Sequence, residues 1–147
     1  MGFAFVPSEE FYEYLYSDSE FCTGLGKVML AAGRLETAVR VCLKSRGVSG
    51  VSPRATLGTL TRALKNAGLL SGNGERHFED LVLKRNYLAH NLFDLFSGQL
   101  EETILERENL VKEDVHVFRE RVENLAHDFM HFVGIVNEAE RRGGVVL

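Results

Sequence analysis

Apolar residues recur along this chain at steps of three and four, the spacing of one face of an α-helix. The pattern is clearest in two long segments. From about Ser19 to Arg46 the apolar positions are Phe21, Leu25, Val28, Ala32, Leu35, Val39 and Cys42. From about Lys112 to Arg142 they are Val115, Phe118, Val122, Leu125, Phe129, Phe132, Val136 and Ala139. Each segment is expected to form a long helix that buries one face.

Three shorter helices are predicted between and before these segments. Residues 8–16 are expected to form an amphipathic helix with Ser8 in the N-cap position and a packing face of Phe11, Tyr12, Leu15 and Tyr16. A second short helix is expected over Thr56–Asn66, with Thr56 as its N-cap. The sequence Ser71-Gly72-Asn73-Gly74 is typical of a turn, so the third short helix is expected to begin near Glu75.

Three glycines interrupt the first long segment, namely Gly24, Gly26 and Gly33. Glycine lowers the intrinsic stability of a helix, and it also allows a neighbouring helix to approach closely. These positions are therefore expected to mark the close approach of another helix.

The helix that begins near Glu75 has an unusual residue on its apolar face. One phase of the pattern runs through Phe78, Leu81, Arg85, Leu88, Leu92 and Leu95, and another through Val82, Arg85, Ala89, Leu92 and Phe96. In both phases Arg85 takes a position that the pattern would give to leucine. A buried arginine needs an anion, a carboxylate or a second subunit to satisfy it.

Together these segments predict an all-α fold, a four- to five-helix up-and-down bundle. One domain over residues 1–147, with its core at about 19–142, suits a chain of this length. Ser97-Gly98 is expected to end the Arg85 helix. Residues 99–110 fit either a helix or a short strand around 103–105, and the sequence leaves both open.

The composition of the chain disfavours several kinds of function and location. The net charge of −4 argues against broad, non-specific coating of nucleic acid, although it allows a small positive groove. No apolar run approaches the ~20 residues of a membrane span, so no membrane association is expected. Cys22 and Cys42 would lie about 30 Å apart along one helix and could not pair. A reducing, cytoplasmic location without a signal peptide is expected.

The candidate chemistry lies in Lys84-Arg85-Asn86-Tyr87-Leu88-Ala89-His90-Asn91. On a helix, Arg85 and His90 point about 140° apart and lie about 7.5 Å apart along the axis. Asn86 and His90 are one turn apart and share a face. An arginine is long enough to reach back toward that face, so the three polar groups could converge on one anion. A phosphate suits that arrangement.

The segment from Arg85 to His90 resembles the signature of the HEPN superfamily, an arginine, commonly followed by a polar residue, and a histidine after four to six intervening residues. The likeness extends upstream to Leu25-Gly26, to Gly33-Arg34-Leu35-Glu36, and to Thr56-Leu57-Gly58-Thr59-Leu60. These segments are similar to the family's pattern in order and spacing, and the resemblance covers most of residues 19–140.

The resemblance implies a helical homodimer that brings two copies of the motif into one cleft. Many such proteins are metal-independent endoribonucleases of toxin or defence systems, so RNA is the expected substrate and a separate antitoxin protein is a possible partner. By matching position, His90 would be the general base on the 2′-hydroxyl, Arg85 would stabilise the phosphorane, and Asn86 would position the phosphate. The product would be a 2′,3′-cyclic phosphate, with no metal or other cofactor.

Two other interpretations of the motif remain open. The chain could be a non-catalytic helical dimer that binds a nucleotide, RNA or a partner protein through the same groove. It could also be a purely structural dimer in which Arg85 satisfies a carboxylate of its own fold. Glu36 is such a carboxylate, although it could instead pair with Arg40 on the surface of its own helix.

A second constellation is His127-Asp128-Phe129-Met130-His131, which has the two-histidine spacing of a helical zinc motif. Aspartate stands where the zincin glutamate would be, no third ligand follows nearby, and both histidines are off the apolar face. A solvated helix face is the preferred interpretation, with no metal site. His77 carries no signal of its own.

Overall fold

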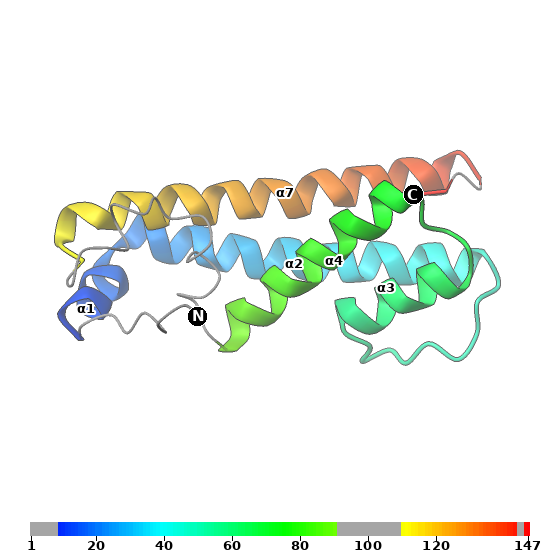
Figure 1. The fold of residues 1–147 in the computed structure, drawn as a ribbon, viewed down its shortest axis with the longest axis horizontal. Coiled ribbons are helices and arrows are strands. Elements are labelled where there is room, and N and C mark those ends of the chain that lie inside the picture. The colour runs from blue at the N-terminus through cyan, green and yellow to red at the C-terminus, as the bar shows by residue number, and fades with distance from the viewer. Residues whose placement is uncertain (1–8, 91–109, 144–145) are drawn as a thin grey trace.

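The computed structural model describes residues 9–90, 110–143 and 146–147, with the side chains of 87–90 excepted. These residues form helices and loops and contain no strand: α1 (Glu9–Ser17), α2 (Ser19–Ser45), α3 (Leu57–Asn66), α4 (Gly72–His90), the short 3₁₀ turn η1 (Lys112–Asp114) and α7 (Val115–Arg141) (Figure 1). The prediction of an all-α bundle is confirmed. Ser8, Ser97-Gly98 and most of the ambiguous segment 99–110 lie outside the described residues.

The two long helices, α2 and α7, lie side by side and run in the same direction (Figure 1). They form one layer of the molecule. α4 crosses this layer at a slant and runs in the opposite direction, α3 packs beside α4, and α1 packs at the end where α2 begins (Figure 1). The helix that carries Arg85 is therefore supported by the α2/α7 layer.

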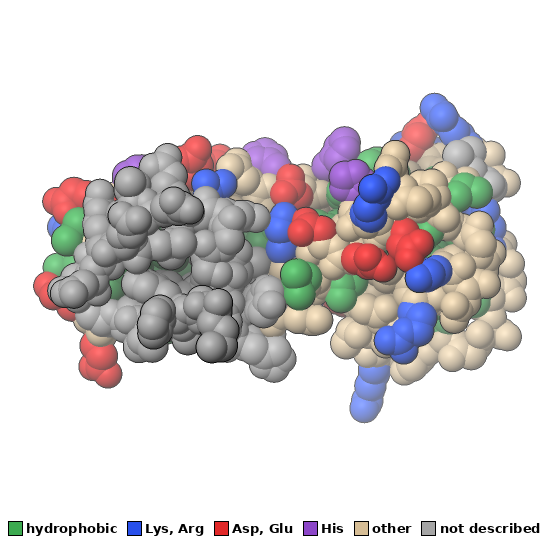
Figure 2. Space-filling model, in the orientation of Figure 1, with side chains coloured by type: hydrophobic (Ala, Val, Ile, Leu, Met, Phe, Trp, Pro, Cys, Tyr) green, Lys and Arg blue, Asp and Glu red, His purple; other side chains and the backbone are tan. Residues whose placement is uncertain are grey.

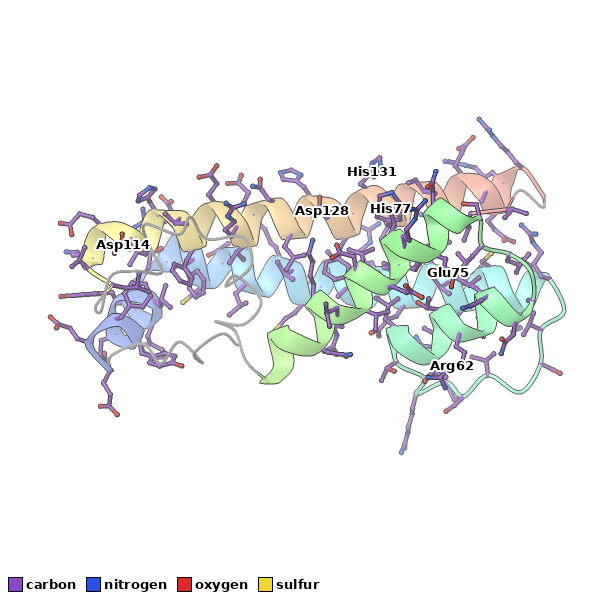
Figure 3. All side chains as sticks on the ribbon, viewed as in Figure 1. Arg62, Glu75, His77, Asp114, Asp128 and His131 are labelled. Atoms are coloured by element: carbon purple, nitrogen blue, oxygen red, sulfur yellow. The ribbon has the colours of Figure 1, made fainter. Side chains whose placement is uncertain are left out.

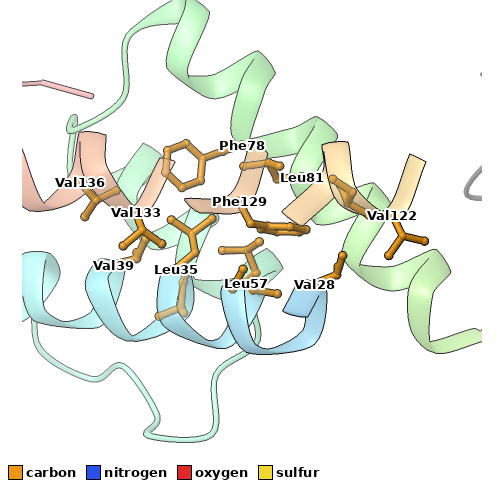
Figure 4. Close-up of a cluster of buried hydrophobic side chains, with 14 of the residues drawn as sticks. Val28, Leu35, Val39, Leu57, Phe78, Leu81, Val122, Phe129, Val133 and Val136 are labelled. Atoms are coloured by element: carbon orange, nitrogen blue, oxygen red, sulfur yellow. The ribbon is translucent and has the colours of Figure 1, made fainter. Parts of the chain in front are cut away.

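The core forms where α2, α3, α4 and α7 meet (Figure 4). Leu35 of α2 and Phe129 of α7 are completely buried, and Leu57, Phe78 and Leu81 of the shorter helices close the cluster. Burial of a leucine or phenylalanine side chain contributes about 1.5–3 kcal/mol relative to exposure. This shared core fixes the position of α4 on the layer.

The predicted apolar faces are confirmed with three differences. On α1, Phe11 and Leu15 are buried as predicted, but Tyr12 and Tyr16 are exposed. Leu25 of α2 is only partly buried, where the prediction placed it on the core face. On α7 Val133 is buried, and Phe132, predicted for that position, is only partly buried. Phe132 instead packs edge-on against Phe78, with their ring centroids 5.7 Å apart, because α4 covers that flank of α7.

The glycines of α2 divide into two kinds. A Cβ at Gly24 would lie 3.1 Å from Cγ1 of Val122, so this glycine allows α7 to approach closely, as predicted. A Cβ at Gly26 or Gly33 would meet nothing within 4 Å. The expectation of a covering helix is wrong for these two positions within the part of the chain that the structure describes.

The start of α4 corrects the sequence prediction. Gly72 to Gly74 form the first helical turn, so the predicted start near Glu75 is three residues late. Ser71 supplies the cap, because its hydroxyl oxygen accepts the backbone N–H of Gly74 at 2.9 Å. Ser71 also donates its own N–H to the main-chain oxygen of Leu147 (2.7 Å), and Leu147 N–H donates to the carbonyl of Leu69 (2.8 Å). Thr56 occupies the predicted N-cap position of α3, but its hydroxyl makes no capping hydrogen bond.

At the end where α2 begins, an ion pair joins α2 to α7. Asp18 caps α2 by accepting the backbone N–H of Phe21 at 2.8 Å. Nε of Arg119 on α7 donates to both carboxylate oxygens at 2.9 Å, and its Nη2 donates to Oδ2. The Arg119 guanidinium lowers the pKa of the Asp18 carboxyl below its ordinary value, with a further contribution from the Phe21 N–H, against the opposing effect of burial.

Both thiols are free, as predicted: Cys22 is exposed, and Cys42 is buried in the core. Burial raises the pKa of the Cys42 thiol, so it stays protonated at neutral pH. None of the helices in the described segments has the length and apolar composition needed to cross a bilayer.

The Asp18–Arg119 pair predicts a pH-dependent stability. Because the carboxyl pKa is lower in the folded state, the pair stabilises the fold above the unfolded pKa of about 3.9, and that contribution is lost as the pH falls through the folded value. Asp18→Asn keeps a capping side chain but removes the charge. Urea unfolding should show a constant deficit relative to the wild type from pH 7 to about 5, which shrinks below pH about 4.

The exposed Glu20, 3.9 Å from Arg119, provides the matched control. Glu20→Gln should leave stability nearly unchanged at every pH, because exposed ion pairs contribute little. A deficit of Asp18→Asn that does not vary with pH would contradict the role given to the charge.

The Leu147 contact predicts a second effect on stability. A Cβ at Gly74 would collide with the main-chain oxygen of Leu147, while a Cβ at Gly72, in the same helical turn, would meet nothing. Gly74→Ala should therefore cost about 1–3 kcal/mol of unfolding free energy. Gly72→Ala should be neutral or slightly stabilising. Equal behaviour of the two variants in urea titrations would show that the contact with Leu147 does not constrain α4.

Candidate functional site

The predicted site residues all lie on α4, toward its C-terminal end. Arg85 is half-buried, with 38% of its side chain exposed. Asn86, one residue later, is exposed. His90 is the last residue of α4, and its side chain lies outside the described residues. The helix thus continues through the whole motif, and the structure does not test whether the imidazole meets the guanidinium.

Arg85 lies against Glu36 of α2. The Nε atom of Arg85 is 3.8 Å from Oε1 of Glu36, within ion-pair range but too long for a hydrogen bond. The Glu36 side chain is only 17% exposed. Arg40, the other partner considered from sequence, instead donates from Nη2 to the carbonyl of Ala55 at 2.6 Å. The alternative in which Glu36 reaches across to Arg85 is therefore the one observed.

The charges around Arg85 are closely balanced. Nζ of Lys84 lies 2.8 Å from Oδ2 of Asp80, one turn back on α4. Over the part of this face that Figure 2 colours by residue type, acidic and basic side chains are interspersed. A phosphate at Arg85 would therefore gain little from the general field of the protein and would have to compete with Glu36 for the guanidinium.

His131 on α7 and His77 on α4 share an aromatic neighbour, Phe132, that the sequence did not reveal. The imidazole of His131 packs edge-on against Phe132, and the imidazole of His77 on α4 packs against the same ring, with centroids 5.7 and 5.4 Å away (Figure 3). His77 thus stabilises the crossing of α4 over α7. Within the described ranges no three His, Cys, Asp or Glu side chains are grouped closely enough to hold a metal ion.

A groove lies between α2 and α7, with a volume of about 770 Å³. Leu30, Ala126 and Met130 are among its apolar lining, and Lys27, Arg34 and Glu123 are among its charged lining. Sequence reasoning missed this groove. A signal was present in Thr23, Lys27, Leu30 and Arg34, which recur on one face of α2 at helical spacing without belonging to the core face.

Comparison with known proteins gives no relative: no family model, no curated protein and no solved structure matches this chain.

The Glu36–Arg85 contact predicts that substitutions of these two residues are coupled in their effect on the free energy of unfolding. Arg85→Leu would leave the largely buried Glu36 without its cation, and should cost about 1 kcal/mol. Glu36→Leu should also destabilise, because it removes the carboxylate beside a half-buried guanidinium. The double variant Glu36→Leu/Arg85→Leu should recover the wild-type stability or exceed it, since apolar packing often replaces a buried pair without loss.

Chemical unfolding of the four proteins measures this coupling. If the loss in the double variant equals the sum of the two single losses, Glu36 and Arg85 do not interact.

Proposed function

We propose that this protein is a metal-independent endoribonuclease of the HEPN toxin or defence type, with Arg85 and His90 as catalytic residues and Asn86 as a substrate-positioning residue. The observation that supports this most is the half-buried Arg85, which lies on an apolar helix position and whose ion-pair partner among the described residues, Glu36, is 3.8 Å away. An arginine that served the fold alone would be expected to hydrogen-bond its carboxylate closely, as Arg119 does with Asp18.

The proposed chemistry needs only side chains. The imidazole of His90 takes the proton of an RNA 2′-hydroxyl, because histidine titrates near neutral pH. The 2′-oxygen forms a bond to the adjacent phosphorus, and the bond from phosphorus to the 5′-oxygen breaks. The leaving 5′-oxygen gains a proton from solvent. The products are a 2′,3′-cyclic phosphate and a 5′-hydroxyl.

Arg85 and Asn86 act on the phosphate in this scheme. The guanidinium stabilises the charge that builds up on the phosphorane oxygens, and the amide of Asn86 holds the phosphate in line. Glu36 would orient the guanidinium before RNA binds. The site is completed by the same helix of a second copy, and a separate antitoxin protein would restrain it in the cell.

A second candidate function is favoured by the same contact. Because Glu36 lies within ion-pair range of Arg85, the arginine could serve a non-catalytic helical dimer that binds a nucleotide, RNA or a partner protein, or one in which it only balances Glu36. The two candidates differ in whether RNA is cleaved.

RNA cleavage in EDTA distinguishes these candidates. The wild type should convert RNA to fragments that end in 2′,3′-cyclic phosphate. His90→Ala and Arg85→Ala should each lower the rate by about 10²–10⁴-fold, the usual contribution of a general base or of a transition-state charge contact. Arg76→Ala is the charge-matched control, since Arg76 is exposed on the same helix and donates a hydrogen bond to Asn73, three residues before it.

Arg76→Ala should cleave at the wild-type rate. Equal residual cleavage by the parent and all variants would indicate a contaminating nuclease and remove the enzymatic function. If His90→Ala and Arg85→Ala also left RNA and nucleotide affinity unchanged, the binding function would fall as well.

A further inference from the structure

The groove between α2 and α7 lies on the side of the layer opposite α4. On the covered side, α4 contacts α2 through Glu36 and α7 through Phe132. Lys27 precedes Glu36 by nine residues, and Glu123 precedes Phe132 by nine, so the members of each pair point about 180° apart on their helix. Lys27 and Glu123 both line the groove. The groove is therefore separate from the proposed ribonuclease site.

The apolar part of the groove is open to solvent. Leu30 of α2 is 73% exposed, and Met130 of α7 is 37% exposed. Deeper in the groove, Ala31 is buried and Ala126 of the other helix is partly buried. Helices pack about 8–10 Å apart, at a distance set by the side chains at the contact, so small residues here allow a third helix to lie close.

Two cations of the groove have no ion-pair partner in the described part of the chain. These are Lys27 and Arg34 of α2. Nη1 of Arg34 is 3.7 Å from Sδ of Met130, and a thioether sulfur is only a weak acceptor. Lys27 and Arg34 are seven residues apart, so they lie on the same face of α2, about 10.5 Å apart along its axis. Both are available to anionic groups that enter the groove.

A charge of opposite sign lies across the groove. Because Gly24 faces Val122, Glu123 of α7 is at about the level of residue 25, close to that of Lys27. No described cation is within ion-pair distance of Glu123. An occupant of the groove must therefore offer acidic groups to α2 and a basic group to α7.

The length and charges of the groove distinguish among occupants. Glu20 and Glu123 in its lining disfavour a nucleic acid, whose phosphates need a basic surface. An acyl chain needs an apolar channel, whereas charged residues recur along this groove. From Glu20 to Arg34 the groove follows fourteen residues of α2, about 21 Å or four helical turns. A helix repeats its side chains on one edge every seven residues, the spacing of Lys27 and Arg34.

We infer that this groove binds an amphipathic helix of another protein. The apolar face of that helix packs on Leu30 and Met130. Two acidic residues seven positions apart on one edge pair with Lys27 and Arg34, and a basic residue on the other edge pairs with Glu123. A helix held in a groove by apolar anchors is a recurring mode of recognition, and the charges at its edges select the partner. The inference does not rest on the proposed ribonuclease activity.

A synthetic helix tests this binding. The probe is a stapled, fluorescein-labelled peptide with a leucine face, two glutamates seven residues apart on one edge and a lysine on the other. A control peptide has lysines in place of the two glutamates. Fluorescence anisotropy should show saturable binding of the glutamate peptide, with a dissociation constant at least about tenfold below that of the control. Equal affinity for both peptides, or binding of neither, would overturn the inference.

Charge reversal on the protein locates the peptide. The double variant Lys27→Glu/Arg34→Glu should weaken binding of the glutamate peptide about tenfold or more and strengthen binding of the lysine peptide. The matched control is Lys44→Glu, because Lys44 is an exposed cation of α2 outside the groove lining. It should leave both affinities unchanged. Circular dichroism checks that the variants keep their helices. Equal effects of the double and control variants would overturn the inference.

Two further measurements identify other occupants. In analytical ultracentrifugation the wild type and Lys27→Glu/Arg34→Glu should sediment alike. A dimer that dissociates in the double variant would place a second copy of the chain in the groove and overturn the inference. Binding of labelled palmitate, with no binding of the glutamate peptide, would assign an acyl ligand and overturn it as well.

RNA cleavage is measured on the same double variant and should equal that of the wild type, because its substitutions face away from α4. Failure of peptide binding with intact cleavage would overturn this inference alone. Absence of cleavage in the wild type, with peptide binding intact, would overturn the proposed function alone.

Discussion

The packing of α2 against α7 is the constraint on which the rest of the structure depends. Gly24 allows the two helices to approach at Val122, and the Asp18–Arg119 pair ties the start of α2 to α7. Because α2 and α7 run parallel for nearly their whole length (Figure 1), they form a continuous support for α4. α4 crosses this support with Phe78 and Leu81 in the shared core. That position brings Arg85 to Glu36.

Arg85 is a charged residue at a position where the fold favours an apolar side chain. Its position would suit a leucine, and a guanidinium there must remain partly hydrated and near a carboxylate. The distance of 3.8 Å to Glu36 balances the charge without using the guanidinium's hydrogen-bonding capacity in a tight pair. In contrast, Arg119 hydrogen-bonds both carboxylate oxygens of Asp18 and so joins α7 to the start of α2. This difference in how closely the two arginines bind their carboxylates is the reason why we propose the catalytic site on α4.

The sequence predicts the helices well because their apolar spacing is unbroken. It places α2 within one residue of its observed end, and the core faces of the two long helices differ only at Leu25 and Phe132. It misplaces the start of α4, because the Ser71-Gly72-Asn73-Gly74 segment has turn composition, while Ser71 and the distant Leu147 together hold it as a helix start. Contacts between residues so far apart in sequence leave no local signal. The same reason explains why sequence left the partner of Glu36 open, and why it missed the Asp18–Arg119 pair, the role of His77 and the α2/α7 groove.

The most direct measurement of the central claim is a crystal structure of the protein with a short RNA whose 2′-hydroxyl at one position is replaced by hydrogen, so that it binds without being cleaved. The account predicts one phosphate within hydrogen-bonding distance of the Arg85 guanidinium, with the His90 imidazole beside the 2′ position and Asn86 on the phosphate. RNA bound elsewhere, with Arg85 still directed only at Glu36 and His90 pointing away, would contradict it.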